Sequence, residues 1–376
     1  MKFFLKRNST LVAMLLIVIL STILTDGLFI SARNLTNLAR QVSINGILAV
    51  GMTYVILISG IDLSVGSVVA LASIVVGISQ INWGWSQYPL LGMLLSTILG
   101  IGVGALCGIF NAYWISKHKM TPFIITLGMM VIARGLALIF SHGEAIAPMS
   151  EELQWMGNGY VSPAMTLYVM GIVLALFIIT SSKAFFNKSL MVFQHGEKGV
   201  IHLSSLLVMV GILFMAYVFF TYRGLPIPVL ILALVACGAH FVLTRMTIGR
   251  YIYAIGGNLE ASRLSGVPIQ KVSFFVFVLM GILAGLCGVI LTGRLNGAMP
   301  TSGQLFELDA IAAVVIGGTS LMGGIGTVTG SLTGAFMIGI LNNSMSLLNV
   351  PTFYQMVIKG LIIILAVFVD SKNRSE

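Results

Sequence analysis

Apolar runs of about 20 residues recur along the whole chain, and they constrain its fold more than any other feature. Hydrophobic residues make up 58% of the 376 residues and charged residues only 8%, whereas a soluble domain averages about 25% charged residues. The mean hydropathy is +1.05. Solid apolar runs of this length cross a bilayer as helices, and they lack the alternation of apolar and polar residues that marks membrane-spanning strands. The sequence therefore predicts an all-α polytopic membrane protein that forms a single transmembrane domain over residues 1–376.

Twelve apolar segments are candidate spans. They cover residues 10–30, 41–59, 63–81, 88–115, 121–141, 164–182, 202–221, 225–244, 271–292, 307–320, 325–347 and 352–369. The first resembles a signal peptide but shows no clear small-x-small cleavage site, so we expect it to be retained as a span. Glycine-containing breaks at residues 60–66 and 317–324 interrupt the third and tenth segments. These two segments either span the membrane fully or re-enter it from one side.

The basic residues predict how the helices are oriented, because cytoplasmic loops carry an excess of Lys and Arg. With the N-terminus in the cytoplasm and twelve spans, both termini are cytoplasmic. Fourteen basic residues then lie inside: Lys2, Lys6, Arg7, Lys117, Lys119, Lys183, Lys188, Lys198, Arg245, Arg250, Arg263, Lys271, Lys372 and Arg374. Four lie outside: Arg33, Arg40, Arg223 and Arg294. The longest outer loop, about 142–163, is acidic. The net charge of +9 therefore reflects membrane topology, and we expect no nucleic-acid partner.

Weak internal similarity indicates an inverted repeat. Segments 2–5 match segments 9–12 in the order of their motifs, and the two halves of the repeat are expected at residues 46–139 and 308–369. The matched positions pair Asp62 with Asp309, Asn111 with Asn342, and Arg134 with Lys359. The copies are seven segments apart, an odd number, so the second copy is inverted in the membrane, as in many transporters. Chance similarity between glycine-rich helices is the alternative interpretation.

The chain has no sequence signature of an enzyme. It lacks the Gly-Lys dipeptide of a phosphate-binding P-loop, and its three cysteines and five histidines show no metal-ligand spacing. Asp62 and Asp309 stand at predicted helix starts, where we expect N-caps rather than ligand contacts. Arg134 and Lys359 lie within segments and are expected to snorkel or to pair with helix-end carbonyls. No carboxylate is clearly placed in mid-membrane, which argues against proton coupling. We expect no catalytic residue, no metal and no cofactor bound by this chain.

Uncharged polar side chains within the segments suit a neutral, hydroxyl-rich substrate, because amides and hydroxyls bind sugar hydroxyls without a charge. The alternative is that they hold helices together by interhelical hydrogen bonds. The candidates for a translocation path are Asn45, Asp62, Ser64, Asn111, Asn296, Asn342 and Asn343.

A polar stretch at residues 249–268 interrupts the apolar second half of the chain. Asn258 is a favoured N-cap residue, and Glu260 then falls in the first turn, where a carboxylate suits the positive end of the helix. Gly266 is placed to end the helix and Pro268 to prevent its continuation. The stretch predicts a short helix of roughly two turns on the cytoplasmic side.

The spacing Glu260-Ala261-Ser262-x-x-x-Gly266 resembles the cytoplasmic coupling motif in membrane subunits of ABC importers. The likeness extends over about 35–370 to the monosaccharide permease family for ribose, galactose and xylose. It is carried by Gly60–Ser67, Gly249–Gly266, Glu307–Gly324, Pro351–Gln355 and Leu365–Asp370. Residues 25–34 and an inserted helix pair, 164–221, are most similar to the xylose-type permease.

The resemblance implies a ten-helix importer-like core plus the inserted pair, in a bacterial inner membrane. It implies that two permease copies form a homodimeric channel among the membrane lipids. Separate cytoplasmic ABC ATPase subunits would bind ATP and Mg, and an extracytoplasmic sugar-binding protein would deliver the monosaccharide. The residues it assigns to ATPase coupling are Gly257, Asn258, Glu260, Ala261, Ser262, Arg263, Leu264, Ser265 and Gly266. An ion-gradient-driven secondary sugar transporter is the rival interpretation, and a membrane enzyme is a third, disfavoured one.

Overall fold

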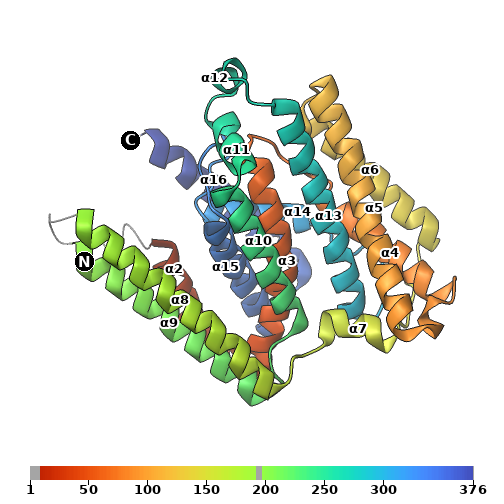
Figure 1. Ribbon diagram of the computed structural model, residues 1–376. Helices are drawn as coiled ribbons and strands as arrows, with labels where there is room; N and C mark the ends of the chain where they lie inside the picture. The colour runs from red at the N-terminus through yellow and green to blue at the C-terminus, as the bar shows by residue number, and fades with distance from the viewer. Residues whose placement is uncertain (1–8, 192–196, 376) are drawn as a thin grey trace. The chain divides into compact units, whose positions relative to one another are not determined.

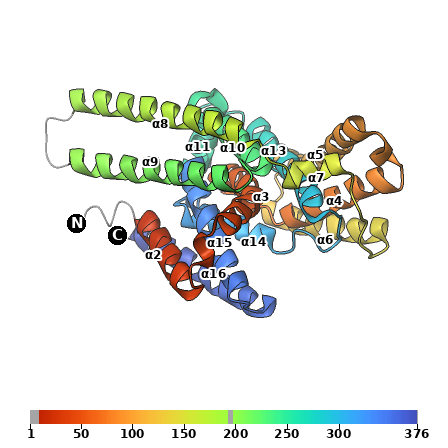
Figure 2. The ribbon, with the colours of Figure 1, turned by 90° about the horizontal axis from the view of Figure 1, so that it is seen from below.

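The computed structural model describes residues 9–191 and 197–375, and over these residues it is helical without a β-sheet. The chain divides into two compact units. Unit 1 comprises the residues up to Ala39 together with Tyr160–Pro226, and unit 2 comprises Arg40–Gly159 and the residues from Ile227 onward. Figures 1 and 2 show the helices that make up each unit.

Unit 1 holds the N-terminal helix and a long helical hairpin. Its helices are α2 (Ser9–Leu24), η1 (Leu28–Ile30), the start of α3 (Ala32–Leu57), α8 (Pro163–Met191) and α9 (Glu197–Tyr222). Helices α8 and α9 lie side by side in both views. The base of this hairpin is closed by backbone hydrogen bonding, because the Val161 N–H donates to the Leu225 carbonyl at 2.8 Å. The Leu225 N–H donates in turn to the Thr166 hydroxyl, also at 2.8 Å.

Unit 2 holds the rest of α3 and most of the remaining helices. They are α4 (Val65–Ile81), η2 (Trp85–Gln87), α5 (Pro89–His118), α6 (Pro122–Ser141), α7 (Glu151–Asn158), α10 (Ile227–Arg245), α11 (Thr247–Gly257), α12 (Leu259–Leu264), α13 (Ile269–Leu295), α14 (Phe306–Ile316), α15 (Val328–Leu347) and α16 (Thr352–Ser375).

Each predicted apolar segment contains one helix, but several boundaries differ from the prediction. Helix α3 begins at Ala32 instead of residue 41, so Arg33 and Arg40 lie within a helix and not in an outer loop. Helices α3, α5, α6, α10 and α13 are long and apolar enough to cross a membrane. Shorter apolar helices account for several other predicted spans. The structure thus bears out a polytopic all-α protein, whereas the count of twelve spans stays a prediction.

Helix α13 packs against α5 through glycines. A Cβ atom added at Gly104 would collide with the carbonyl of Gly281, and one at Gly108 would lie 2.7 Å from the Phe277 carbonyl. At the same interface, Gly285 faces the carbonyl of Gly100. Small residues allow the two backbones to approach this closely, which is the means by which membrane helices gain packing energy. Gly100, Gly104 and Gly108 therefore form a packing face of α5. Because α5 residues that come later in the chain meet earlier residues of α13, the two helices are antiparallel.

The break between α3 and α4 and the break before α14 bring two helix starts together. A Cβ added at Gly66, at the start of α4, would collide with the Gly303 carbonyl and the Glu307 carboxylate at the start of α14. Gly60 lies near Phe277, and Gly288 packs on Val69, so this meeting point is near the middle of α13. Helix α14 has only 11 residues, which span about 16 Å of the roughly 30 Å hydrocarbon core. It therefore cannot cross a bilayer by itself.

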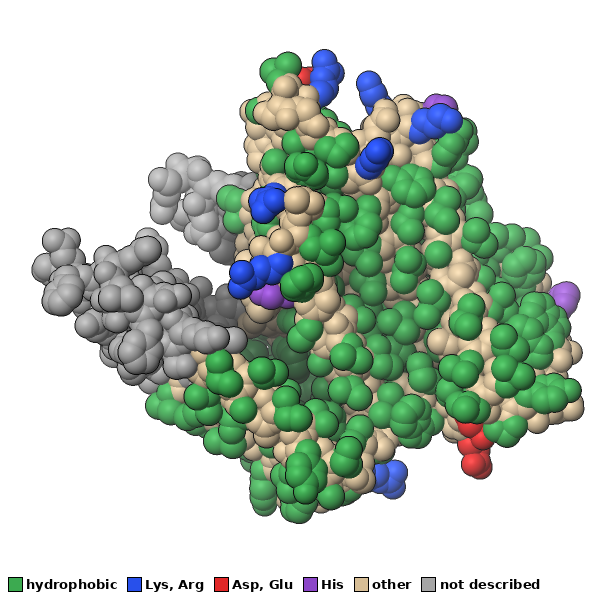
Figure 3. All heavy atoms as spheres, in the orientation of Figure 1, with side chains coloured by type: hydrophobic (Ala, Val, Ile, Leu, Met, Phe, Trp, Pro, Cys, Tyr) green, Lys and Arg blue, Asp and Glu red, His purple; other side chains and the backbone are tan. Residues whose placement is uncertain are grey.

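Basic side chains gather at the end of unit 2 that carries α12. Lys117 and Lys119 follow the last turns of α5, and Lys271 lies in the first turn of α13. The antiparallel packing of these two helices places them at one end, next to Arg263 of α12. On the face that Figure 3 shows, Lys and Arg side chains collect toward this end, and hydrophobic side chains cover much of the rest. This distribution is typical of a membrane protein with one basic, water-facing side.

The glycine interface can be tested with a matched pair of substitutions in α5. Gly104→Val forces a branched side chain against the α13 backbone, and we expect this overpacking to lower stability by about 1–3 kcal/mol. In Gly102→Val the same residue points into open space, so only the small helix-propensity term changes. Thermal unfolding of the detergent-purified protein should show a lower midpoint for Gly104→Val than for Gly102→Val. Equal midpoints would contradict the packing described here.

Candidate functional site

Helix α12 is the short capped helix that the sequence predicts. The Asn258 side chain accepts a hydrogen bond from the Ala261 N–H at 2.9 Å, which satisfies one free donor of the first turn. Glu260 lies in that turn, and Gly266 ends the motif with φ +78°. Residues 247–257, which we had not predicted to be helical, form α11. The predicted capping signals are confirmed, and the polar stretch consists of two helices instead of one.

The exposed surface of α12 is small and mixed in character. The Leu264 side chain is 84% exposed, and Glu260 forms a solvent-exposed ion pair with Arg263 at 3.7 Å. Ser262 is buried at 5% exposure, and Val267 packs against the core of unit 2. Ser262 therefore offers little exposed surface in this chain by itself, and its assignment to ATPase coupling stays a prediction. The exposed residues of α12 are Leu259, Glu260, Ala261, Arg263 and Leu264.

The helix that precedes α12 is wedged against two distant backbone segments. A Cβ added at Gly256 would collide with both the Leu57 carbonyl at the end of α3 and the Gly324 N–H. These two groups are hydrogen-bonded to each other at 3.0 Å. The Tyr253 hydroxyl donates to the Gly326 carbonyl at 2.8 Å. We call this contact, made by Gly256, Leu57 and Gly324, the glycine junction. It connects α11 with the 317–327 turn that follows α14.

Neighbouring glycines in α11 provide a test of the junction. Gly256→Ala adds one methyl group where backbone atoms leave no room, whereas Gly257→Ala adds it where nothing lies within 4 Å. We expect Gly256→Ala to separate α11 from the 317–327 turn at a cost of about 1–3 kcal/mol. Gly257→Ala should leave stability nearly unchanged.

Limited proteolysis at the 317–327 turn would report the difference directly. Faster cleavage in Gly256→Ala alone is the expected result. Equal cleavage in the two variants would show that the junction does not hold the turn.

A polar cavity of about 120 Å³ lies in the half of unit 2 farther from α12. The cavity is far from α12 because Arg294, one of its lining residues, lies near the end of α13 that is opposite to α12. Parts of α3, α13, α14, α15 and α16 enclose it. Its lining residues are Gln41, Ile44, Asn45, Arg294, Phe306, Asp309, Asn342, Ser346, Gln355 and Lys359.

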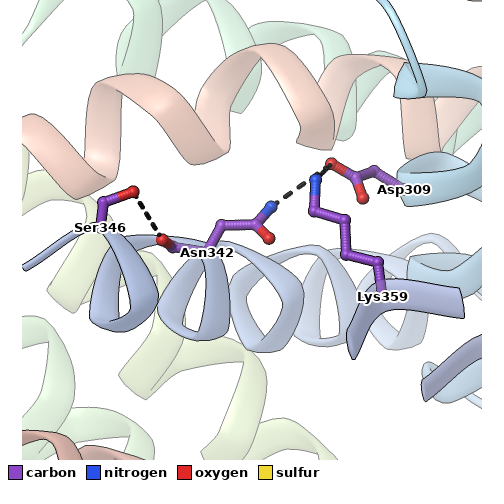
Figure 4. Close-up of polar contacts among 4 residues, drawn as sticks. All are labelled: Asp309, Asn342, Ser346 and Lys359. Atoms are coloured by element: carbon purple, nitrogen blue, oxygen red, sulfur yellow. Dashed lines mark hydrogen bonds and ion pairs between the residues drawn. The ribbon is translucent and has the colours of Figure 1, made fainter. Parts of the chain in front are cut away.

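The Asp309 carboxylate contacts two other residues that line this cavity (Figure 4). The Lys359 ammonium contacts Asp309 Oδ2 at 2.9 Å, and the Asn342 amide donates to the same oxygen at 3.3 Å. The Asp309 side chain is 5% exposed and that of Lys359 is 22% exposed. Ser346 donates to the Asn342 carbonyl one turn along α15. Two expectations are corrected here, because Asp309 does not cap α14 and a carboxylate is buried within the apolar segments after all.

A second polar cluster lies at the start of α4. Asp62 Oδ1 accepts hydrogen bonds from the Ser64 N–H at 2.8 Å and from its hydroxyl at 2.6 Å. The Asn111 amide donates to the same hydroxyl at 3.1 Å. The Asn111 carbonyl oxygen is buried without a hydrogen-bond partner among the described residues. Asp62 therefore fixes the turn before α4 but does not cap the helix as expected, because the N-cap residue is Ser64. The three path candidates of this cluster do not line the cavity.

The remaining predicted residues have other roles. Arg134 donates to the carbonyls of Pro300 and Ser302, which fixes the loop before α14 and confirms the expected pairing with carbonyls. Asn296, with φ +52°, accepts a hydrogen bond from the Met149 N–H at 2.9 Å. Asn343 is buried. Of the seven path candidates, only Asn45 and Asn342 line the cavity. Sequence reasoning did not find the Asp309–Lys359 pair, because these residues lie on different helices 50 positions apart.

The energetic role of the Asp309–Lys359 pair can be measured by removing one charge or both. Lys359→Met leaves the Asp309 carboxylate unpaired, and we expect a loss of about 3 kcal/mol, the lower end for buried pairs because Lys359 retains some exposure. The double variant Lys359→Met/Asp309→Asn removes the charge imbalance and should recover most of this loss. Thermal unfolding midpoints of the purified variants test whether the double variant is more stable than Lys359→Met. A double variant less stable than Lys359→Met would contradict the pairing.

The chain is similar to known membrane transport proteins over nearly its whole length. The family model described as the permease component of branched-chain amino acid transport systems matches residues 34–367. A xylose transport system permease protein from Escherichia coli is 39% identical over 363 residues, which cover 96% of this chain and 91% of that protein. The chain belongs to this family of transport permeases. No solved structure matches it.

Other permeases of the family are nearly as similar. The xylose transport system permease protein of Haemophilus influenzae is 38% identical over 366 residues, covering 97% of this chain and 96% of that protein. The ribose import permease protein of the same organism is 36% identical, covering 98% and 94%. These alignments cover nearly all of this chain. The permease is therefore similar over most of its length to proteins named for xylose and ribose transport.

Proposed function

We propose that this chain is the membrane-spanning permease subunit of an ATP-binding-cassette importer that moves a monosaccharide into the cytoplasm. The proposed substrate is xylose or a related pentose or hexose. The observation that carries the proposal is α12, a capped helix that presents an 84% exposed leucine and a charged pair at the basic end of unit 2. Such a surface suits a docking groove on a protein partner. Near-full-length similarity to xylose and ribose permeases supports the choice of a sugar.

The proposal assigns the energy source to other chains. Separate cytoplasmic ATPase subunits would bind ATP and Mg, and this chain would perform no chemistry itself. A second copy of the permease would complete the channel in the bacterial inner membrane, with both termini in the cytoplasm. An extracytoplasmic sugar-binding protein would deliver the sugar to the side opposite α12. Helix α7 is positioned for this contact, since Glu151 and Glu152 of its first turn lie next to the end of α13 that is opposite to α12.

Within the chain, two routes lead from α12 to the membrane interior. One is direct, because α13 begins five residues after α12 ends and extends to the cavity. The other passes through α11 and the glycine junction to the 317–327 turn and α14, which carries Asp309. The first route is the short chain connection itself, and the second consists of backbone packed on backbone, which deforms little. A displacement of α12 by the ATPase would therefore move α13 and α14 together.

The two polar clusters support an inverted repeat of 46–139 and 308–369. In each, an Asp near the start of a buried helix shares hydrogen bonds with an Asn on the following helix: Asp62 with Asn111 through Ser64, and Asp309 with Asn342 directly. The meeting of α4 and α14 near the middle of α13 is the arrangement that such repeats produce at a transport path. The clusters differ in their basic residue, since Lys359 contacts its Asp and Arg134 binds carbonyls instead.

Charge reversal on two short helices tests the role of α12. Glu260 and Glu152 both occupy the second position of a capped short helix. Replacing either one with Lys therefore removes a similar favourable interaction with the helix dipole, about 0.3–1 kcal/mol. We expect Glu260→Lys to lose co-purification with the ATPase subunit from native membranes, at unchanged insertion and nearly unchanged thermal stability. Glu152→Lys should retain the ATPase.

Retention of the ATPase by Glu260→Lys would rule out the coupling role of α12. Uptake that survives ATP depletion but stops when an ion gradient is dissipated would favour the secondary carrier instead. The burial of Asp309 and of Asp62 fits such a carrier. The direct contact of Asp309 with Lys359 counts against a freely titrating carboxylate at that position.

A further inference from the structure

We propose that the cavity around Asp309 is a transit subsite that holds one monosaccharide ring, with Asp309 as the acceptor for sugar hydroxyls and Phe306 as the apolar wall. This inference rests on the proposed sugar transport and identifies where the sugar is held and by which groups. None of the seven path candidates contributes the central group, because Asp309 was expected to cap a helix.

The size of the cavity fits a single small sugar. Its volume of about 120 Å³ is several times the roughly 30 Å³ that one water molecule takes in the liquid, and it is well below the roughly 300–1,000 Å³ of pockets for drug-sized ligands. A space of this size favours a small ligand such as a pentose, C5H10O5, over a disaccharide, which has more than twice as many non-hydrogen atoms.

The polar wall offers hydrogen-bonding positions that remain open. Lys359 and Asn342 both contact Oδ2 of Asp309, whereas Oδ1 receives no hydrogen bond from the described residues. The Asn45 side chain, on α3, lines the same space at 5% exposure and has no hydrogen-bond partner within the described part of the chain. Both residues line the cavity, so a ligand that enters it can supply a hydrogen bond at each of these positions. Carboxylate and amide together can accept from and donate to neighbouring hydroxyls.

The polar lining suits a ligand rich in hydroxyl groups better than a cation. The negative charge of Asp309 is already matched by Lys359 at 2.9 Å, so a cation gains little. Arg294 also lines the cavity, and its guanidinium can donate hydrogen bonds to sugar oxygens. The remaining polar lining groups are amides and a hydroxyl, from Gln41, Asn45, Asn342, Gln355 and Ser346. Phe306 supplies an aromatic face against which the apolar C–H face of a pyranose ring can pack. Few placed polar groups beside an apolar wall are typical of small-ligand sites.

Binding is tested first, without transport. Ser346→Cys places a thiol in the cavity wall, in a Cys237→Ser background that leaves only the buried Cys107 and Cys287. The full complex of permease, ATPase and binding protein is labelled in membranes with a polar maleimide, with and without xylose. We expect xylose to slow labelling of Ser346→Cys several-fold. Labelling of Thr301→Cys, an exposed position that does not line the cavity, should not change. Sucrose at equal concentration should protect neither, and a pentose phosphate should protect less than xylose.

Transport of deoxy sugars then tests the role of Asp309. In the wild-type complex, the xylose analogue that lacks the hydroxyl facing Asp309 should be transported about tenfold less efficiently than xylose, because a charged acceptor loses its donor. In Asp309→Asn that ratio should fall to about twofold or less. Asn45→Ala leaves the Asp309–Lys359 pair intact. It should reduce the transport difference between xylose and an analogue that lacks a different hydroxyl. The binding protein is the same in every assay, so its own preference cancels from the comparison.

Equal labelling with and without xylose would overturn the subsite, as would an identical deoxy-sugar profile in the wild type and both variants. Stronger protection by pentose phosphate than by xylose would overturn the choice of a neutral ligand. These failures differ from a failure of the proposed function. If only the subsite is wrong, the wild-type complex still accumulates sugar with ATP. If the proposed function is wrong, ATP-driven accumulation is absent whatever the labelling shows.

Discussion

The backbone contact between α13 and its neighbours is the constraint on which unit 2 depends. In lipid, apolar side chains gain nothing by leaving the solvent, so helices associate through close packing and internal hydrogen bonds. Gly104 and Gly281 allow the backbones of α5 and α13 to pack closely, and Gly288 allows α13 to pack closely on α4. Helix α13 is thereby fixed along its length. Because it begins beside α12 and ends beside the cavity, the same contact that holds the fold also joins its two functional ends.

The buried charges follow from the same absence of water. Within apolar surroundings a charged side chain needs a partner, and Asp309 has Lys359 and Asn342. Arg134 has backbone carbonyls instead. Each pairing crosses between helices that are distant in sequence, so the polar groups also fix the loops around the short helix α14. What the pairings leave open, Asp309 Oδ1 and the Asn45 amide, faces the cavity. The polar network that stabilises the interior is thus the same one that offers positions to a ligand.

Local features of this fold could be read from the sequence, and long-range ones could not. The helices and the caps of α12 depend on residues a few positions apart, and these predictions hold. The early start of α3 was missed because Arg33 and Arg40 resemble loop residues. The Asp309–Lys359 pair and the glycine junction join residues more than 45 positions apart, for which a single sequence carries no signal. Asp309 was misjudged because a helix start favours a capping carboxylate, and only the packing of α15 and α16 directs this one elsewhere.

The central claim is that the ATPase displaces α12, and that α13 and α14 then move and let a sugar pass to the cytoplasm. The most direct test is accumulation of labelled xylose in proteoliposomes that contain the permease, its ATPase and its binding protein. The account predicts ATP-dependent accumulation against a gradient that is lost when the ATPase is omitted and when Glu260→Lys replaces the native permease. Accumulation driven by an ion gradient through the permease alone would contradict it.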